Sequence, residues 1–131
     1  MSTDDELVAG FEAGSLLEFH HADHVRLTIE YLERHGRIEA LRRLEEGLLR
    51  LATSDGQAER FHVTLTRAWL ELISAARTAH PDASDAASLV AACPWLLDKD
   101  VLLRFYSREC LNSEPARTRW VPPDRGEISS L

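Results

Sequence analysis

The residues of this chain best suited to chemistry are histidines. Residues 19–24 read Phe-His-His-Ala-Asp-His, so His21 and His24 are three positions apart. Residues three apart in a helix lie on the same face, and this face continues into apolar residues that should point inward. His62 precedes Leu65 on the predicted buried stripe of a later helix. If the two helices pack antiparallel, His62 comes close to His24.

One chemistry for these histidines is the binding of a divalent metal ion. Neutral imidazole is a good ligand for zinc, iron and copper. A catalytic zinc site uses three protein ligands and one open position, and His21, His24 and His62 would supply the three. Asp23 would be a further ligand or would accept an imidazole N–H. The chain has no His-Glu-x-x-His or Cys-x-x-Cys motif, so the spacing is also typical of histidines that only make structural hydrogen bonds.

The same residues would also allow acid–base catalysis without a metal. His24 or His62 would act as a general base, because an imidazole titrates near neutral pH, and Asp23 or a threonine would hold the ring. The sequence leaves open whether His20 or His21 lies beside this site.

A polar series follows near the C-terminus and consists of Tyr106, Arg108, Arg117 and Asp124. Such a series is typical of a hydrogen-bonded network that holds short helices to the rest of a domain. In the alternative, Tyr106 and Arg117 line a pocket for an anionic ligand, because arginine forms two parallel hydrogen bonds with a carboxylate. Tyr106 is therefore a further candidate catalytic residue.

Composition argues against some partners. The chain has 131 residues, with 15 basic and 22 acidic side chains and a net charge of −7. Proteins that bind nucleic acid or anionic membranes usually present a basic face, whereas the arginines here are interspersed with glutamates. We therefore expect neither nucleic acid nor a membrane as partner. A small-molecule ligand and a second copy of the chain stay open as partners.

The cysteines and the N-terminus favour a cytoplasmic location. Cys93 and Cys110 form no closely spaced pair, and the acidic N-terminus lacks the apolar segment of a signal peptide. Neither cysteine lies in a motif typical of a nucleophile. Cys93 precedes Pro94 in an apolar run, which is typical of a small buried residue.

Helix signals recur along the whole chain, and no segment alternates apolar and polar residues as a half-buried strand would. Thr3 and Gly14 bracket the first predicted helix, and Gly36 separates the second from the third. The apolar stripe of the third helix is predicted to be Ile38, Leu41, Leu44, Leu48 and Leu51. The predicted helices cover about residues 4–13, 22–35, 37–53, 57–79, 83–92 and 99–106, with a last short one after Ser113.

Asp82, Asp98 and Ser113 are the expected N-caps of the three short helices near the C-terminus. The predicted fold is an all-α, compact bundle of three long helices with short C-terminal helices packed across it. Residues 1–131 form one domain, in which residues 1–3 and about 125–131 are expected to be mobile.

Three motifs occur in order along the chain. They are Phe-His-His-Ala-Asp-His-Val-Arg-Leu at 19–27, Phe-His-Val-Thr-Leu-Thr at 61–66, and a stretch at 103–124 that contains Phe-Tyr-Ser, Ala-Arg and Pro-Asp. Together they resemble a family of small, uncharacterised bacterial all-helical proteins with the pattern His-x-Asp-His, Tyr-His-x-Thr-x-Thr and Tyr…Ala-Arg…Pro-Asp. Phe61 replaces the tyrosine of this pattern. The resemblance implies functional roles for His21, Asp23, His24, His62, Thr66 and Tyr106.

We therefore expect a small cytoplasmic protein whose histidine site acts on a small molecule, in bacterial secondary metabolism. The alternative is a non-catalytic binding or assembly module, whose exposed helical faces pack against a partner or a second copy. Trp69, Trp95 and Trp120 would then include anchors of the interface. The sequence leaves open whether the protein is an enzyme.

Overall fold

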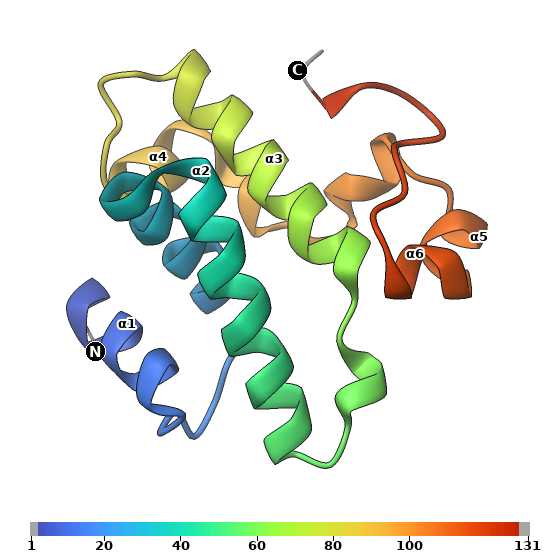
Figure 1. Cartoon of the computed structure of the whole chain (residues 1–131). Helices are drawn as coiled ribbons and strands as arrows, with labels where there is room; N and C mark the ends of the chain where they lie inside the picture. Colours follow the sequence, from blue (N-terminus) through green and yellow to red (C-terminus); the bar gives the residue numbers. More distant parts are fainter. Residues whose placement is uncertain (1–2, 129–131) are drawn as a thin grey trace.

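The computed structural model describes residues 3–128, and all regular structure in this range is helical (Figure 1). The α-helices are α1 (Asp4–Ala13), α2 (His21–Ser54), α3 (Val63–Ala79), α4 (Ala86–Ala92), α5 (Arg108–Leu111) and α6 (Glu114–Thr118). Short 3-10 helices lie between them, namely η1 (Ala58–Arg60), η2 (Pro94–Leu97) and η3 (Lys99–Arg104). The predicted all-helical class is confirmed, and the finer arrangement as a bundle of three long helices stays a prediction.

Helix α1 begins and ends where the local sequence predicts. The Thr3 hydroxyl accepts a hydrogen bond from the backbone N–H of Glu6 at 3.1 Å. Gly14 ends the helix with a φ of 69°, in the left-handed region that glycine adopts without steric cost. The predicted range 4–13 is confirmed because both signals act within one turn of the helix.

Gly36 divides α2 into two helical halves, at the position where the sequence predicts a break. Its φ of 78° and ψ of 175° are not helical, so the chain changes direction there (Figure 1). The second half runs alongside α3 (Figure 1), and most of the largest fully buried side chains come from α3 and from both halves of α2. They include Tyr31, Leu44, Leu70 and Ile73.

The predicted apolar stripe of the second half is wrong at Ile38, which is 83% exposed. The buried residues there are Ala40, Leu44 and Gly47. At about 100° per residue, Ile38 is displaced by roughly 120° around the helix from Leu44. Its apolar side chain therefore faces solvent, while Leu41 on the near flank is partly buried.

The predicted helix over 57–79 begins later, at Val63. Phe61 and His62 both have extended backbone conformations, and the ring of His62 caps α3 by accepting the N–H of Leu65. The apolar spacing continues through this segment, so periodicity alone does not reveal a cap formed by a histidine.

The predicted helix over 83–92 also begins later, at Ala86. Asp85 caps it by accepting the N–H of Ser88 at 2.7 Å, so the expected cap Asp82 is wrong. The caps predicted at Asp98 and Ser113 are confirmed, since both side chains accept backbone N–H groups of the turns that follow them.

The segment after α6 lies along the start of α3 (Figure 1). The Thr64 hydroxyl donates to the carbonyl of Arg119 at 2.8 Å and accepts the N–H of Val121. The Tyr106 hydroxyl donates to the carbonyl of Val121 at 2.7 Å. Two buried side chains thus fix one extended segment by its backbone, independently of that segment's own side chains.

Several residues of the expected mobile ends make defined contacts. Thr3 caps α1, the backbone N–H of Arg125 donates to the carbonyl of Phe105, and Ile128 packs against the core. Residues 1–2 and 129–131, which belong to the same prediction, lie outside the described residues. Among the helices of residues 3–128, none has the length and apolar character needed to cross a bilayer.

A substitution at Gly47 tests how α1 packs on α2. A Cβ atom at this position would overlap the ring of Phe11, which is buried between the two helices. Overpacking lowers the free energy of unfolding by about 1–3 kcal/mol. Alanine is a better helix former than glycine, which raises it by up to about 1 kcal/mol. We expect Gly47→Ala to lower the free energy of unfolding by about 1–2 kcal/mol in urea denaturation.

The Phe11→Leu background provides the control, because the smaller side chain leaves room for the new methyl group. Gly47→Ala should cost less there than in the wild-type chain. An equal cost in both backgrounds would show that the close approach of Phe11 to Gly47 is not what limits this position.

Candidate functional site

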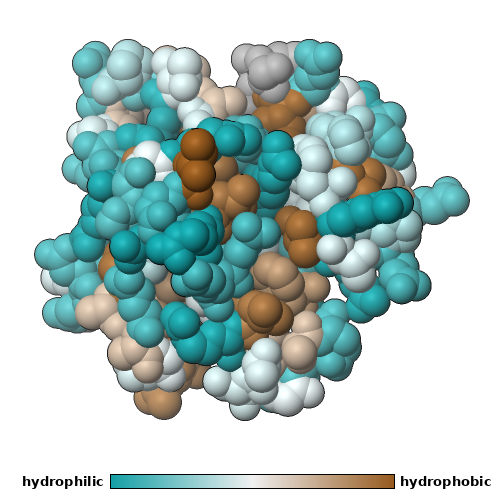
Figure 2. Space-filling model, in the orientation of Figure 1, coloured by the Kyte–Doolittle hydropathy of each residue, from teal (hydrophilic) through white to brown (hydrophobic). Residues whose placement is uncertain are grey.

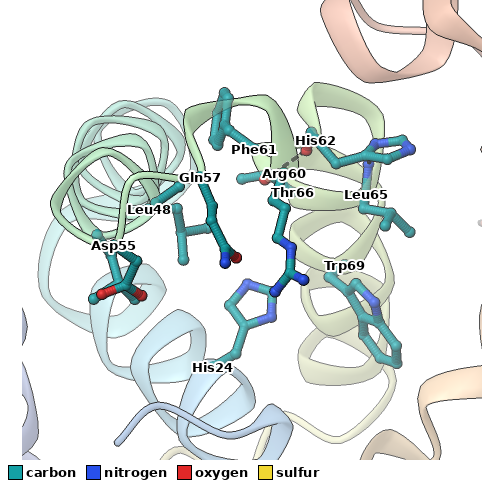
Figure 3. Close-up of a pocket in the computed structure, with 12 residues that line it drawn as sticks. His24, Leu48, Asp55, Gln57, Arg60, Phe61, His62, Leu65, Thr66 and Trp69 are labelled. Carbon is teal, nitrogen blue, oxygen red and sulfur yellow. Dashed lines mark hydrogen bonds between the residues drawn. The ribbon is translucent and has the colours of Figure 1, made fainter. Parts of the chain in front are cut away.

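A pocket of about 330 Å³ lies where α2 ends, η1 follows and α3 begins (Figure 3). This volume is at the lower end of the range for small-molecule sites. Its walls are mostly apolar, and a few polar side chains enter it. The lining residues are His24, Leu48, Leu51, Ala52, Asp55, Gln57, Arg60, Phe61, His62, Leu65, Thr66 and Trp69.

His24 lies at the base of this pocket, and its ring points into it (Figure 3). The residue as a whole is partly exposed, but its Nε2 atom is buried and has no hydrogen-bond partner within residues 3–128. Burial, with a smaller contribution from the nearby imidazole of His21, lowers the pKa of His24 to about 4. The ring is therefore neutral at physiological pH. The other buried atoms without a partner, on Tyr31 and Arg67, do not line this pocket.

The mouth of the pocket carries two opposite charges. Asp55 follows the last residue of α2, and Arg60 is the last residue of η1. Within the described part of the chain, neither forms an ion pair or a side-chain hydrogen bond, and they do not pair with each other. Gln57 and Arg60 point into the same cavity as His24 (Figure 3). The Thr66 hydroxyl donates to the carbonyl of His62, so it can only accept from a ligand.

His62 also borders the pocket, but its ring is directed away from the centre (Figure 3). Its Nδ1 accepts the N–H of Leu65 at 3.0 Å, so Nε2 carries the proton and donates to the carbonyl of Leu111 at 2.7 Å. Burial lowers the pKa of His62, which keeps the ring neutral. Both nitrogens are occupied, so neither is available to a metal ion or a substrate.

His21 lies beside His24, with 6.4 Å between the ring centroids, as the spacing predicts. Its Nε2 bonds to the carbonyl of Leu96 at 2.9 Å, and its ring packs against Trp69 with 4.5 Å between centroids. Burial is the main cause that lowers the pKa of His21. His21, and not His20, is therefore the neighbour of the candidate site, since the ring of His20 is exposed beside Glu18.

The three predicted metal ligands do not form a metal site. In residues 3–128, no group of three or more His, Cys, Asp or Glu side chains is arranged to hold an ion. His21 and His62 direct ring nitrogens to backbone carbonyls, whereas only His24 has a buried nitrogen without a partner. The structure thus retains one of the three histidines as a candidate for binding chemistry.

The other two candidate catalytic residues lie outside this pocket. Asp23 accepts the backbone N–H of His20 at 3.0 Å and stabilises the start of α2, so it does not hold a histidine ring. Tyr106 is fully buried, and burial raises its pKa. Its hydroxyl is used by the carbonyl of Val121.

Asp124 and Arg117 of the C-terminal polar series make structural hydrogen bonds. Both carboxylate oxygens of Asp124 bond to Ser107, one to its backbone N–H and one to its hydroxyl. The guanidinium of Arg117 donates to the carbonyl of Glu59 at 2.9 Å. This bond anchors η1, and therefore the backbone that carries Arg60, to α6.

Sequence reasoning missed the charged mouth of the pocket. Asp55 lay in the gap between two predicted helices, and Gln57 and Arg60 fell inside the predicted helix over 57–79. The motif at 61–66 marks the adjoining wall, but no local signal indicates that the loop folds back over His24.

Comparison with family models, curated proteins and solved structures gives no match. The resemblance to a bacterial family stays a prediction.

The lowered pKa of His24 predicts a specific pH dependence of stability. Between its ordinary pKa of 6.5 and about 4, the unfolded chain binds a proton that the folded protein does not. The stabilisation is complete above pH 6.5 and is lost as the pH falls toward 4, by at most about 3 kcal/mol. The lowered pKa values of His21 and His62 act with the same sign.

Urea denaturation of the wild type and of His24→Leu at pH 7.0, 5.5 and 4.5 checks this. The free energy of unfolding should fall with pH in both proteins, because His21 and His62 remain. The fall should be smaller in His24→Leu. Parallel pH profiles would show that His24 is protonated as readily in the folded protein as in the unfolded chain.

Proposed function

We propose that this protein binds a small molecule in the pocket above His24, and that the neutral imidazole of His24 hydrogen-bonds to the ligand. The observation that carries the proposal is the buried Nε2 atom, which has no partner within residues 3–128. Leaving a buried polar atom unsatisfied costs about 1–3 kcal/mol. A ligand that reaches the base of the pocket would recover this free energy on binding.

The protonation state of His24 defines the chemistry that it offers. A ring with a pKa of about 4 is deprotonated at pH 7 and can take up a proton as a general base. Asp23 does not orient this ring, because its carboxylate is engaged at the start of α2. The proposal therefore includes proton transfer from a bound small molecule to the imidazole of His24, without a metal ion.

Finer predictions from the sequence accompany this proposal. They are a cytoplasmic location, a role in bacterial secondary metabolism, and the resemblance to the bacterial family described above. The motif residues His24, His62 and Thr66 all border the pocket, which supports a common reason for their spacing. In this view His62 positions the start of α3, while His24 contacts the ligand.

The alternative, a docking or assembly module, has weaker support. Large apolar side chains are exposed at Leu17, Ile38, Leu49 and Leu97. On the face shown in Figure 2, however, apolar residues are scattered among hydrophilic ones and do not form one continuous surface. Docking surfaces usually present a contiguous apolar patch.

Replacing His24 should separate binding from stability. His24→Leu removes a buried nitrogen without a partner, so the folded protein at pH 7 should be as stable as the wild type or more stable. The variant should at the same time lose ligand binding. Ligands are to be found by ¹H–¹⁵N NMR screening of a fragment library, and the dissociation constants are to be compared for the two proteins.

His62→Leu is the matched control, because both nitrogens of His62 have partners. Losing the helix cap and the bond to Leu111 should lower the free energy of unfolding by about 2 kcal/mol. The proposal fails if no fragment perturbs the resonances of the pocket residues. It also fails if His24→Leu binds fragments in the pocket as tightly as the wild type.

A further inference from the structure

The pocket is electrically polar along its mouth. Asp55 stands at the C-terminal end of α2, and Arg60 stands three residues before α3 begins. A helix carries partial negative charge at its C-terminus and partial positive charge at its N-terminus. Each side chain thus has the same sign as the helix end beside it, and the mouth has one negative and one positive side.

Neither charge is neutralised within the described residues. Most other arginines of α2 and α3 pair with carboxylates, such as Arg42 with Glu39 and Arg77 with Glu33. Arg60 and Asp55 border the same pocket without forming a pair. Two opposite charges held apart across a cavity are complementary to a ligand that carries both.

Most of the rest of the pocket is apolar. Leu48, Leu51, Phe61, Leu65 and Trp69 line it, and His24 forms its base. Because exposed charged groups and apolar side chains border the same cavity, the pocket suits a molecule with a charged head and an apolar body. The imidazole of His24, which burial keeps neutral, adds no third charge to this arrangement.

We infer that the ligand of this pocket is a zwitterion of the amino-acid type with a large apolar side chain. This inference rests on the proposed function. The carboxylate of the ligand binds the guanidinium of Arg60 through two N–H groups. Its ammonium group faces Asp55, and its side chain enters the apolar part above His24. A simple carboxylate would leave Asp55 unpaired beside it, and a simple amine would leave Arg60 unpaired.

A set of compounds with one side chain and different charges tests this inference. The set consists of L-phenylalanine, N-acetyl-L-phenylalanine, which lacks the ammonium charge, and L-phenylalaninamide, which lacks the carboxylate. Titrations followed by ¹H–¹⁵N NMR should show L-phenylalanine binding at least about tenfold more tightly than either derivative. L-Leucine and its two derivatives repeat the comparison with an aliphatic side chain.

Variants that remove one charge of the pocket test which charged group of the ligand each side chain binds. Arg60→Gln should weaken binding of L-phenylalanine about tenfold and leave binding of the amide unchanged. Asp55→Asn should weaken binding of L-phenylalanine and leave binding of N-acetyl-L-phenylalanine unchanged. Arg108→Gln and Asp82→Asn are the matched controls, because they make the same charge changes at exposed positions outside the pocket and should not alter binding.

The outcomes separate this inference from the proposed function. If neutral or singly charged fragments bind in the pocket while both amino acids do not, the inference of a zwitterionic ligand is wrong, and the proposed small-molecule site is retained. The same conclusion follows if the blocked derivatives bind as tightly as the free amino acids. If nothing in the fragment library or in the amino-acid set perturbs the pocket residues, both proposals are wrong.

Discussion

The pair of hydrogen bonds made by the ring of His62 is the interaction on which the candidate site depends. One bond starts α3 at Val63, and the other ties that start to Leu111 at the end of α5. The two bonds require a neutral ring with its proton on Nε2. Because α3 begins only at Val63, the preceding residues form a separate short turn, η1, which contacts α2 and contributes to the wall of the pocket.

The C-terminal segment reinforces this arrangement from the other side. Thr64 lies two residues after His62 and holds the backbone of residues 119 and 121, while Arg117 reaches back to the carbonyl of Glu59 in η1. The short helices at the C-terminus are therefore supports for a loop that carries Arg60. Their sequence contributes little to the lining of the pocket but determines where its positive side lies.

Features set within one helical turn could be predicted from the sequence. The Thr3 cap, the Gly14 stop and the break at Gly36 depend on neighbouring residues only. The start of α3 could not be predicted, because its cap is a histidine fixed by a carbonyl 49 residues away. For the same reason the sequence indicated histidines as candidates without separating His24 from His62. That separation depends on whether a ring nitrogen finds a backbone partner, and distant segments provide those partners.

The three partly buried histidines differ in whether a backbone group bonds to a buried ring nitrogen. Each has a pKa lowered mainly by burial, so all three rings are neutral at pH 7. Hydrogen bonds to backbone carbonyls offset this desolvation at His21 and His62, whereas no group within residues 3–128 does so for Nε2 of His24. A side chain chosen for stability alone would be apolar at position 24, because the apolar replacement avoids the cost. The proposed ligand would account for an imidazole at this position, because it would complete the hydrogen bond of Nε2.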